Sequence, residues 1–384
     1  MAEKHEKRPV RILHTGDIHL DSPFSRLRPE KSEARRREMR ATFTRLMQTV
    51  REKKVDLVLI AGDLFDSEYV TSATVSLLAG EMAACADCRF FISPGNHDPY
   101  VGGSLYALGR LPKNVTVFSS EELVAVPVPA CNATVYGWAF TSARYEGAPL
   151  SGKRAARDGS LQLVCGHAEV GVPLSKYAEV PVSDIAAFGA HYAAFAHRHI
   201  PTPVTDAGGG ALYAYCGCME GRSFDESGIG GAYLVTATPD GEDWRIETER
   251  VPLAKSRYEV LSLDLTGVDS EAEIADRISA AVAENGYGED TFLRVIFTGA
   301  TPPDFAVPAV AEGSALGLFD LELVDRTTPT FDAAFLEKDM TVRGELYRSL
   351  LPRLTSGSPE ERAIAARALR IGLSALAGND ITNL

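Results

Sequence analysis

Three apolar runs near the start of the chain constrain its fold most. The segments "VRIL", "VDLVLIAGD" and "RFFISPGNHD" are rich in branched and aromatic residues, and each leads into a Gly- or Asp-rich loop. Apolar side chains recur between them at helical spacing: Met39, Phe43, Leu46, Met47 and Val50, then Val75, Leu78, Ala79 and Met82. This order predicts a β-α-β-α-β unit, in which ligands gather outside the carboxyl ends of the strands.

From about residue 115 the strand-like runs continue without long helices between them. They are "VTVF", "LVAVPV", "TVYGW", "LQLVCGH", "YAAFAH", "ALYAYCG", "GAYLVT" and "WRIETERV". This pattern predicts a second sheet stacked on the first. We therefore expect an α/β fold (an α+β sandwich) of two stacked mixed β-sheets flanked by helices.

The composition changes near residue 257. "YEVLSLDL" and "FLRVIFTG" are strand-like, and between them a helix opens with a capping box of Ser270 and Glu273. Residues 258–340 contain 17 Asp and Glu against 4 Lys and Arg. We expect a small, acidic α+β domain here.

The end of the chain is helical in pattern. One apolar stripe runs from Val342 to Leu354, and a second helix begins at Ser358 with Pro359 in its first turn. Such a hairpin packs either on its own chain or on a partner. The predicted domains are a charged leader at 1–9, a catalytic domain at 10–252, an acidic cap at 257–330 and a helical tail at 331–384.

Five polar clusters interrupt the apolar strands. They are Asp17-Ile18-His19, Gly62-Asp63-Leu64-Phe65-Asp66, Gly95-Asn96-His97-Asp98, Gly166-His167 and His197-Arg198-His199. One such cluster is an ordinary turn, but five strand ends that all present carboxylate, carboxamide or imidazole have no ordinary common explanation. Those ligand types suit Mn, Fe and Zn, and the clusters contain no cysteine for a thiolate site. The conjunction predicts a binuclear metal site.

The spacing of His197 and His199 is informative. On a strand, residues i and i+2 point to the same side, whereas just past its end they diverge enough to serve neighbouring metals. A carboxylate that bridges such a pair holds the ions about 3.5–4 Å apart, the separation at which both act on one phosphate.

These motifs, in this order, resemble the calcineurin-like metallophosphoesterase superfamily. The similarity is greatest to its DNA-repair exonuclease branch, the SbcD and YhaO type. "HTGDIHLDSPF" is similar to the opening of the YhaO-like group, and "GRSFDE" at 221–226 resembles a segment that follows its last motif. The motif resemblance spans about residues 10–235.

The resemblance implies two divalent ions, Mn²⁺ first and Fe, Zn or Mg as alternatives. It implies that one ion is held by Asp17, His19, Asp63 and His199. It implies that the other is held by Asp63, Asn96, His167 and His197, with Asp63 as the bridge. His97 would stabilise the transition state or protonate the leaving oxygen, with Asp66 orienting its ring.

One residue departs from the family pattern. The family usually has Gly before its His-x-His motif, where this chain has Ala196. An alanine there is strained if the backbone needs a positive φ, and otherwise adds a tolerated methyl. Outside the motifs, we expect His14 to be a hydrogen-bonded core histidine rather than a ligand.

Three functions are compatible with these motifs. The first is a metal-dependent DNA-repair exonuclease, and the second is a phosphatase or phosphodiesterase for nucleotides, cyclic nucleotides or phosphoprotein. The third is a metal-binding scaffold for an ATPase partner that cleaves nothing. "GDLFDSE" and "GNHDPY" differ from the Gly-Asp-x-x-Asp-Arg-Gly and Gly-Asn-His-Glu motifs of phosphoprotein phosphatases, which favours the nuclease.

Charge bears on the partners. The chain carries a net −13, but residues 1–54 carry 15 Lys and Arg against 8 Asp and Glu. Arg35, Arg36 and Arg37 are either DNA contacts or a solvated face. The expected partners are DNA, an SMC-like coiled-coil ATPase on the helical tail and a second copy in a homodimer. With no signal-peptide pattern and no apolar run of membrane-spanning length, we expect a cytoplasmic protein without membrane contact.

Overall fold

The computed structural model of the chain describes residues 8–66, 70–301, 307–308, 313–330 and 332–376. It divides into two compact units, Met1–Lys255 and Ser256–Leu384. Residues 1–7 of the predicted leader and 377–384 of the predicted tail lie outside the described residues. The further division of the second unit into a cap and a tail stays a prediction.

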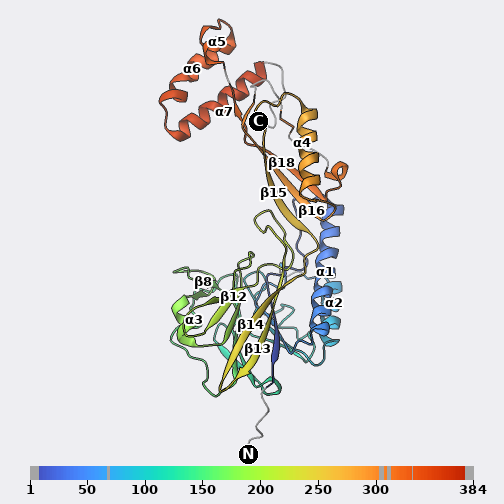
Figure 1. Ribbon diagram of the computed structural model, residues 1–384. Coiled ribbons are helices and arrows are strands. Elements are labelled where there is room, and N and C mark those ends of the chain that lie inside the picture. The colour runs from blue at the N-terminus through green and yellow to red at the C-terminus, as the bar shows by residue number, and fades with distance from the viewer. Residues whose placement is uncertain (1–7, 67–69, 302–306, 309–312, 331, 377–384) are drawn as a thin grey trace, which may run out of the picture. The chain divides into compact units, whose positions relative to one another are not determined.

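The first unit contains two six-stranded sheets (Figure 1). The first has the strand order β14-β13-β1-β2-β3-β4, in which β1 to β4 are parallel and β13 and β14 antiparallel. Its strands are β1 (Val10–Thr15), β2 (Leu57–Ile60), β3 (Arg89–Ile92), β4 (Val115–Val117), β13 (Gly231–Asp240) and β14 (Asp243–Pro252).

The second sheet has the order β11-β12-β10-β7-β6-β5, again with both parallel and antiparallel pairs. Its strands are β5 (Val124–Val128), β6 (Ala133–Gly137), β7 (Leu161–His167), β10 (Tyr192–Ala196), β11 (Thr205–Asp206) and β12 (Leu212–Tyr215). The pair β8 (Glu169–Val170) and β9 (Glu179–Val180) and the 3₁₀ helix η1 (Pro129–Cys131) complete the unit's minor elements.

The prediction of two stacked mixed sheets with flanking helices is confirmed, but three strands were assigned to the wrong sheet. Three of the eight runs predicted for the second sheet, "VTVF", "GAYLVT" and "WRIETERV", belong to the first as β4, β13 and β14. β13 pairs antiparallel with β1, with Val10 opposite Ala237.

The layers follow from which faces of the strands are apolar. In β1 and β2, Ile12 and Leu59 face the second sheet, while Leu13 and Ile60 face the helices. Because these strands are buried on both faces, their sequences are continuously apolar rather than alternating. The helices are α1 (Pro29–Glu52) and α2 (Ser72–Ala83) on one side of the unit, and α3 (Val182–Phe188) on the other (Figure 1).

The second unit holds a small parallel sheet in the order β15-β16-β18, beside α4. Ser270 caps α4, because its side chain accepts a hydrogen bond from the amide of Glu273. The elements are β15 (Arg257–Asp264), α4 (Glu271–Glu284), β16 (Thr291–Thr298), β17 (Ala300–Thr301), η2 (Gly313–Leu316), β18 (Asp320–Asp325) and β19 (Thr328–Pro329).

Three helices follow: α5 (Ala333–Lys338), α6 (Val342–Ser356) and α7 (Pro359–Leu376). The capping box of α7 is formed, since Ser358 and Glu361 each accept a hydrogen bond from the other's backbone amide. α6 and α7 pack through Tyr347 and Leu369. No helix among the described residues has both the length and the hydropathy needed to cross a membrane.

Candidate metal centre

All five polar clusters lie at the carboxyl ends of strands. Asp17 and His19 follow β1, Asp63 follows β2, and Asn96 follows β3 in the first sheet. His167 ends β7, and His197 and His199 follow β10 in the second sheet. The carboxyl ends of two parallel strand sets thus converge, and the structure brings together every residue predicted to hold a metal.

The backbone of these loops is strained at the same residues. Asp17, His19 and Asp63 have φ values of 45°, 49° and 49°, and His197 has 110°. Non-glycine residues rarely adopt positive φ, and such strain concentrates at functional sites. The positive φ values direct these side chains into the space between the loops.

Ala196 does not carry this strain. It lies at the end of β10 in extended conformation, and the positive φ belongs to the next residue, His197. Its methyl group packs against Gly16, where an added Cβ would lie only 2.5 Å from it. The departure from the family pattern is therefore a methyl that the strand accommodates.

Two neighbouring glycines are required by close approach. A Cβ on Gly95 would lie 2.2 Å from Asp63 Oδ1, and a Cβ on Gly62 would lie 2.4 Å from His167 Nδ1. Gly62 also has a φ of 106°. Both glycines leave room for a side chain of the centre.

One half of the centre joins His19 and His199. Their Nε2 atoms face each other at 3.2 Å. Asp17 completes a group whose ligand atoms all lie within 4.8 Å of one another. Two imidazole nitrogens that converge on one point with a carboxylate form a donor set suited to a divalent ion.

The other half joins Asn96, His167 and His197. Asn96 Oδ1 lies 2.9 Å from His167 Nε2 and 3.3 Å from His197 Nδ1, and the two ring nitrogens are 3.3 Å apart. Nδ1 of His167 donates to the carbonyl of Ala61 at 3.0 Å, which leaves Nε2 with its lone pair toward the centre.

Asp63 lies between the two halves. Its Oδ2 is 3.4 Å from His167 Nε2 and 3.7 Å from His19 Nε2. One carboxylate oxygen is therefore close to an imidazole of each half, as a bridging ligand requires.

The burial of these groups fits bound cations. Asp17 and Asp63 are 0% and 1% exposed, yet in the part of the chain that the structure describes neither forms an ion pair with Lys or Arg. Burial raises the pKa of Asp17, so the ionised form needs a counter-charge. Burial also lowers the pKa of His197 to about 3, which keeps it in the neutral form that binds metals.

His97 lies at the exposed edge of the centre. Its side chain is 42% exposed, and its ring meets that of His19 edge-on at 4.9 Å between centroids. Its Nδ1 is 3.3 Å from the backbone carbonyl of Asp66 and 3.6 Å from the carboxylate. The carboxylate of Asp66 instead lies 3.0 Å from His19 Nδ1, without hydrogen-bond alignment, and 2.6 Å from Arg222.

Asp98, next to His97, braces the loops rather than facing the centre. Its carboxylate accepts hydrogen bonds from the amides of Leu64, Phe65 and Gly95 and from the hydroxyl of Tyr106. It thereby ties the loop after β2 to the loop after β3.

Two residues that the sequence did not single out border the centre. Glu226 Oε1 lies 2.5 Å from His199 Nδ1, and Arg222 holds the Asp66 carboxylate. Burial opposes ionisation of both Glu226 and His199, but their hydrogen bond lowers the pKa of Glu226 to about 2 and raises that of His199. The only sequence signal was the resemblance of "GRSFDE" to a family segment.

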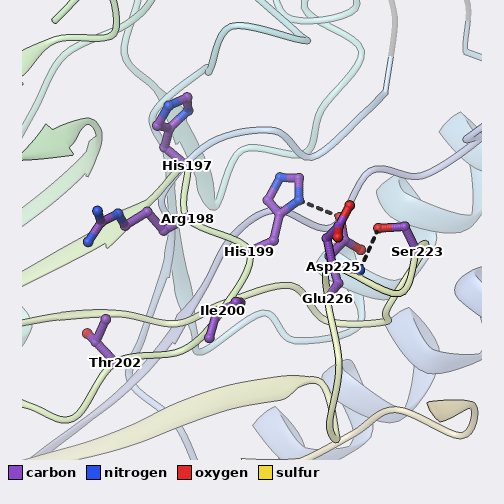
Figure 2. A pocket seen from close by; sticks show the side chains of 8 residues that line it. All are labelled: His197, Arg198, His199, Ile200, Thr202, Ser223, Asp225 and Glu226. Carbon is purple, nitrogen blue, oxygen red and sulfur yellow. Dashed lines mark hydrogen bonds and ion pairs between the residues drawn. The ribbon is translucent and has the colours of Figure 1, made fainter. Parts of the chain in front are cut away.

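A pocket of about 620 Å³ opens beside His197 and His199 (Figure 2). Arg198 lies on one side of it, with its guanidinium 5.6 Å from the ring of Tyr215. The lining residues are His197, Arg198, His199, Ile200, Thr202, Ser223, Asp225 and Glu226.

The model of the family described as calcineurin-like phosphoesterase matches residues 10–201. The chain belongs to this family. The match covers the strands and loops that build the centre, and it confirms the resemblance found in the motifs. The His and Asp groups of this phosphoesterase are therefore candidate metal sites in a family of metallophosphoesterases.

Its similar proteins are distant. The uncharacterized metallophosphoesterase YhaO of Bacillus subtilis is 23% identical over 302 residues, which cover 76% of this chain and 72% of that protein. The DNA double-strand break repair protein Mre11 of Aeropyrum pernix is 27% identical, over 63% of this chain and 61% of that protein. The SbcD component of the nuclease SbcCD of Escherichia coli K12 is 32% identical, but only over 23% of this chain and 21% of that protein.

Proposed function

We propose that this phosphoesterase is a metal-dependent phosphodiesterase that acts as a DNA exonuclease. The position of Asp63 Oδ2 between the two imidazole groups carries the catalytic part of the proposal. The names of two similar proteins, a nuclease component and a DNA repair protein, support the choice of DNA.

The proposed roles of the residues follow the two halves of the centre. One ion would be held by Asp17, His19, Asp63 and His199, and the other by Asp63, Asn96, His167 and His197. Two divalent ions bound there, Mn²⁺ first and Fe, Zn or Mg as alternatives, would supply Lewis acidity toward the phosphate and lower the pKa of water.

His97 is the proposed acid of the reaction. Its exposed ring stands at the edge of the centre, where a substrate oxygen can reach Nε2. The hydrogen bond from Nδ1 to the Asp66 carbonyl would fix the tautomer. Asp66 would thus orient His97 mainly through its backbone, while its carboxylate acts on His19 and Arg222.

DNA binding by the arginines of α1 remains a proposal, but one of the three candidates does not fit that role. Arg35 is fully buried and pairs with Glu38 and Glu220, so it does not present its guanidinium to DNA. Arg36 pairs with Glu33, whereas Arg37 is exposed and available for a phosphate.

A small phosphodiester or nucleotide is the second candidate substrate. A pocket of about 620 Å³ lies within the range of small-molecule sites. The excess of acidic residues over 258–340 also disfavours DNA contact by that segment.

The proposed protein partners follow from the similarity to the nuclease component SbcD and the DNA repair protein Mre11. A coiled-coil ATPase of SMC type would dock on α6 and α7, where Val342 and Ile364 are 68% and 62% exposed. A homodimer is a further proposal.

The discriminating experiment incubates the purified chain and Mn²⁺ with single- and double-stranded DNA, bis-p-nitrophenyl phosphate and cyclic nucleotides. Release of nucleotides from DNA ends is expected. Cleavage of the small diesters without any action on DNA would reject the exonuclease and leave the second candidate. Binding of Mn²⁺ without any turnover would favour the scaffold.

A further inference from the structure

The segment between β12 and β13 borders the centre with acidic and basic side chains. This 220–226 segment consists of Glu220, Gly221, Arg222, Ser223, Phe224, Asp225 and Glu226. Figure 2 shows Glu226 directed at the ring of His199, and the two atoms involved, Oε1 and Nδ1, are 2.5 Å apart. Nε2 of the same ring faces His19, so Glu226 contacts the nitrogen that points away from the centre.

A second contact runs from Arg222 through Asp66. Nη1 of Arg222 donates to Asp66 Oδ1 at 2.6 Å, and that oxygen lies 3.0 Å from His19 Nδ1. The outward nitrogen of His19 therefore also faces a carboxylate. Arg222 is itself tied to Glu226, whose Oε2 accepts from its backbone amide at 2.6 Å.

The segment is fixed in place by buried contacts to α1. Nη2 of Arg35 donates to the carbonyl of Gly221 at 2.7 Å, and Thr42 Oγ1 donates to Glu220 Oε1 at 2.5 Å. Both Arg35 and Glu220 are 0% exposed. The 220–226 segment can therefore fix the orientations of the His19 and His199 rings.

The two halves of the centre differ in this respect. In one half, His199 is hydrogen-bonded to a carboxylate at its outward nitrogen. His19, in the same half, has the Asp66 carboxylate 3.0 Å from its outward nitrogen, without hydrogen-bond alignment. His167, in the other half, has a neutral backbone carbonyl there. A carboxylate raises the basicity of a ligating imidazole and fixes its ring angle, and loss of such a partner typically costs 10- to 100-fold in metal affinity.

We propose that Glu226 and Arg222 are positioning residues for the ion held by His19 and His199, and for that ion alone. The inference rests on the proposed two-metal function. Glu226 orients His199 directly, and Arg222 orients His19 through Asp66. Neither residue is needed to hold the second ion at His167 and His197.

Calorimetric titration of the metal-free full chain with Mn²⁺ tests this selectivity. The wild type is expected to bind two ions, and Glu226→Gln is expected to bind one of them about 10- to 100-fold more weakly while the other is unchanged. Arg222→Gln should weaken the same ion. General damage to the fold would weaken both ions, so selective loss is the signature of positioning.

Asp243→Asn is the matched control, because Asp243 pairs at 2.9 Å with His191, a histidine outside the centre. It should bind both ions as the wild type does. Two ions bound with wild-type affinities by both Glu226→Gln and Arg222→Gln would overturn the inference, as would equal weakening of both ions in both variants. A wild type that binds fewer than two ions would instead overturn the two-metal function on which the inference rests.

Discussion

The backbone amide of His97 donates a hydrogen bond to Asp63 Oδ1 at 2.9 Å. The proposed acid is thus tied to the proposed bridging ligand through the chain rather than through its ring. Its imidazole stands at the exposed edge of the centre, where it meets the ring of His19 edge-on and donates no hydrogen bond to Asp63. Removing the ring should therefore leave the arrangement of the ligands intact.

His97→Ala should retain both ions and lose turnover by about 10²- to 10⁴-fold, the usual contribution of a general acid. Metal content by mass spectrometry and hydrolysis of DNA, whose alkoxide leaving group needs a proton, measure the two effects. Loss of the metals in this variant would show that His97 is a ligand or a structural support instead.

Gly95→Ala should weaken Mn²⁺ binding by about tenfold or more, because its Cβ would lie 2.2 Å from Asp63 Oδ1 and displace the shared ligand. Gly102→Ala is the matched control, since no atom lies within 4 Å of its added Cβ. Equal Mn²⁺ affinities for the two variants would contradict the bridging role of Asp63.

Tyr106→Phe should lower the free energy of unfolding by about 1 kcal/mol, the usual net contribution of one hydrogen bond, because the amides of Leu64, Phe65 and Gly95 still donate to Asp98. The hydroxyl donates to Asp98, which is 4% exposed and joins two loops of the centre. Urea unfolding in the presence of a chelator measures the loss. A change below about 0.5 kcal/mol, the usual size for a surface substitution, would show that this hydrogen bond contributes little.

His14 is the core histidine that the sequence predicted. It is fully buried, and its nitrogens contact the hydroxyl of Tyr192 and the carbonyl of Phe195. Burial lowers its pKa to about 3. Below pH 6.5 His14 binds a proton in the unfolded chain but stays neutral in the folded chain. The stability that neutral His14 contributes is therefore complete above pH 6.5 and is lost as the pH falls toward 3.

The destabilisation caused by His14→Gln should therefore shrink by about 2 kcal/mol between pH 7.5 and pH 5, since one pKa unit corresponds to about 1.4 kcal/mol. Urea unfolding of both proteins with chelator at the two pH values provides the comparison. A pH-independent difference would mean that the pKa of His14 is the same in the folded and unfolded chains.

Local pattern was sufficient to predict the strands but not all of their neighbours. The run that forms β13 is apolar enough to be a strand in either sheet, and only its pairing with β1, with Val10 opposite Ala237, assigns it to the first. Such pairing depends on contacts far apart in the sequence, which periodicity does not contain. The motifs at strand ends were predictable because strand direction alone brings them together.

The contacts that orient the proposed metal ligands could not be predicted from the sequence. The Asp66 carboxylate turns toward Arg222, which lies 156 residues away, and not toward His97. Glu226 lies in a loop after β12, where the resemblance of "GRSFDE" to a family segment marked the stretch but gave Glu226 no role. Both roles become visible only when the chain is folded.

Anomalous scattering from crystals soaked in Mn²⁺ would locate the ions of the proposed two-metal centre. Two peaks are expected about 3.5–4 Å apart on either side of the Asp63 carboxylate, one at His19 and His199 and the other at His167 and His197. A single peak, or peaks away from Asp63, would contradict the two-metal centre.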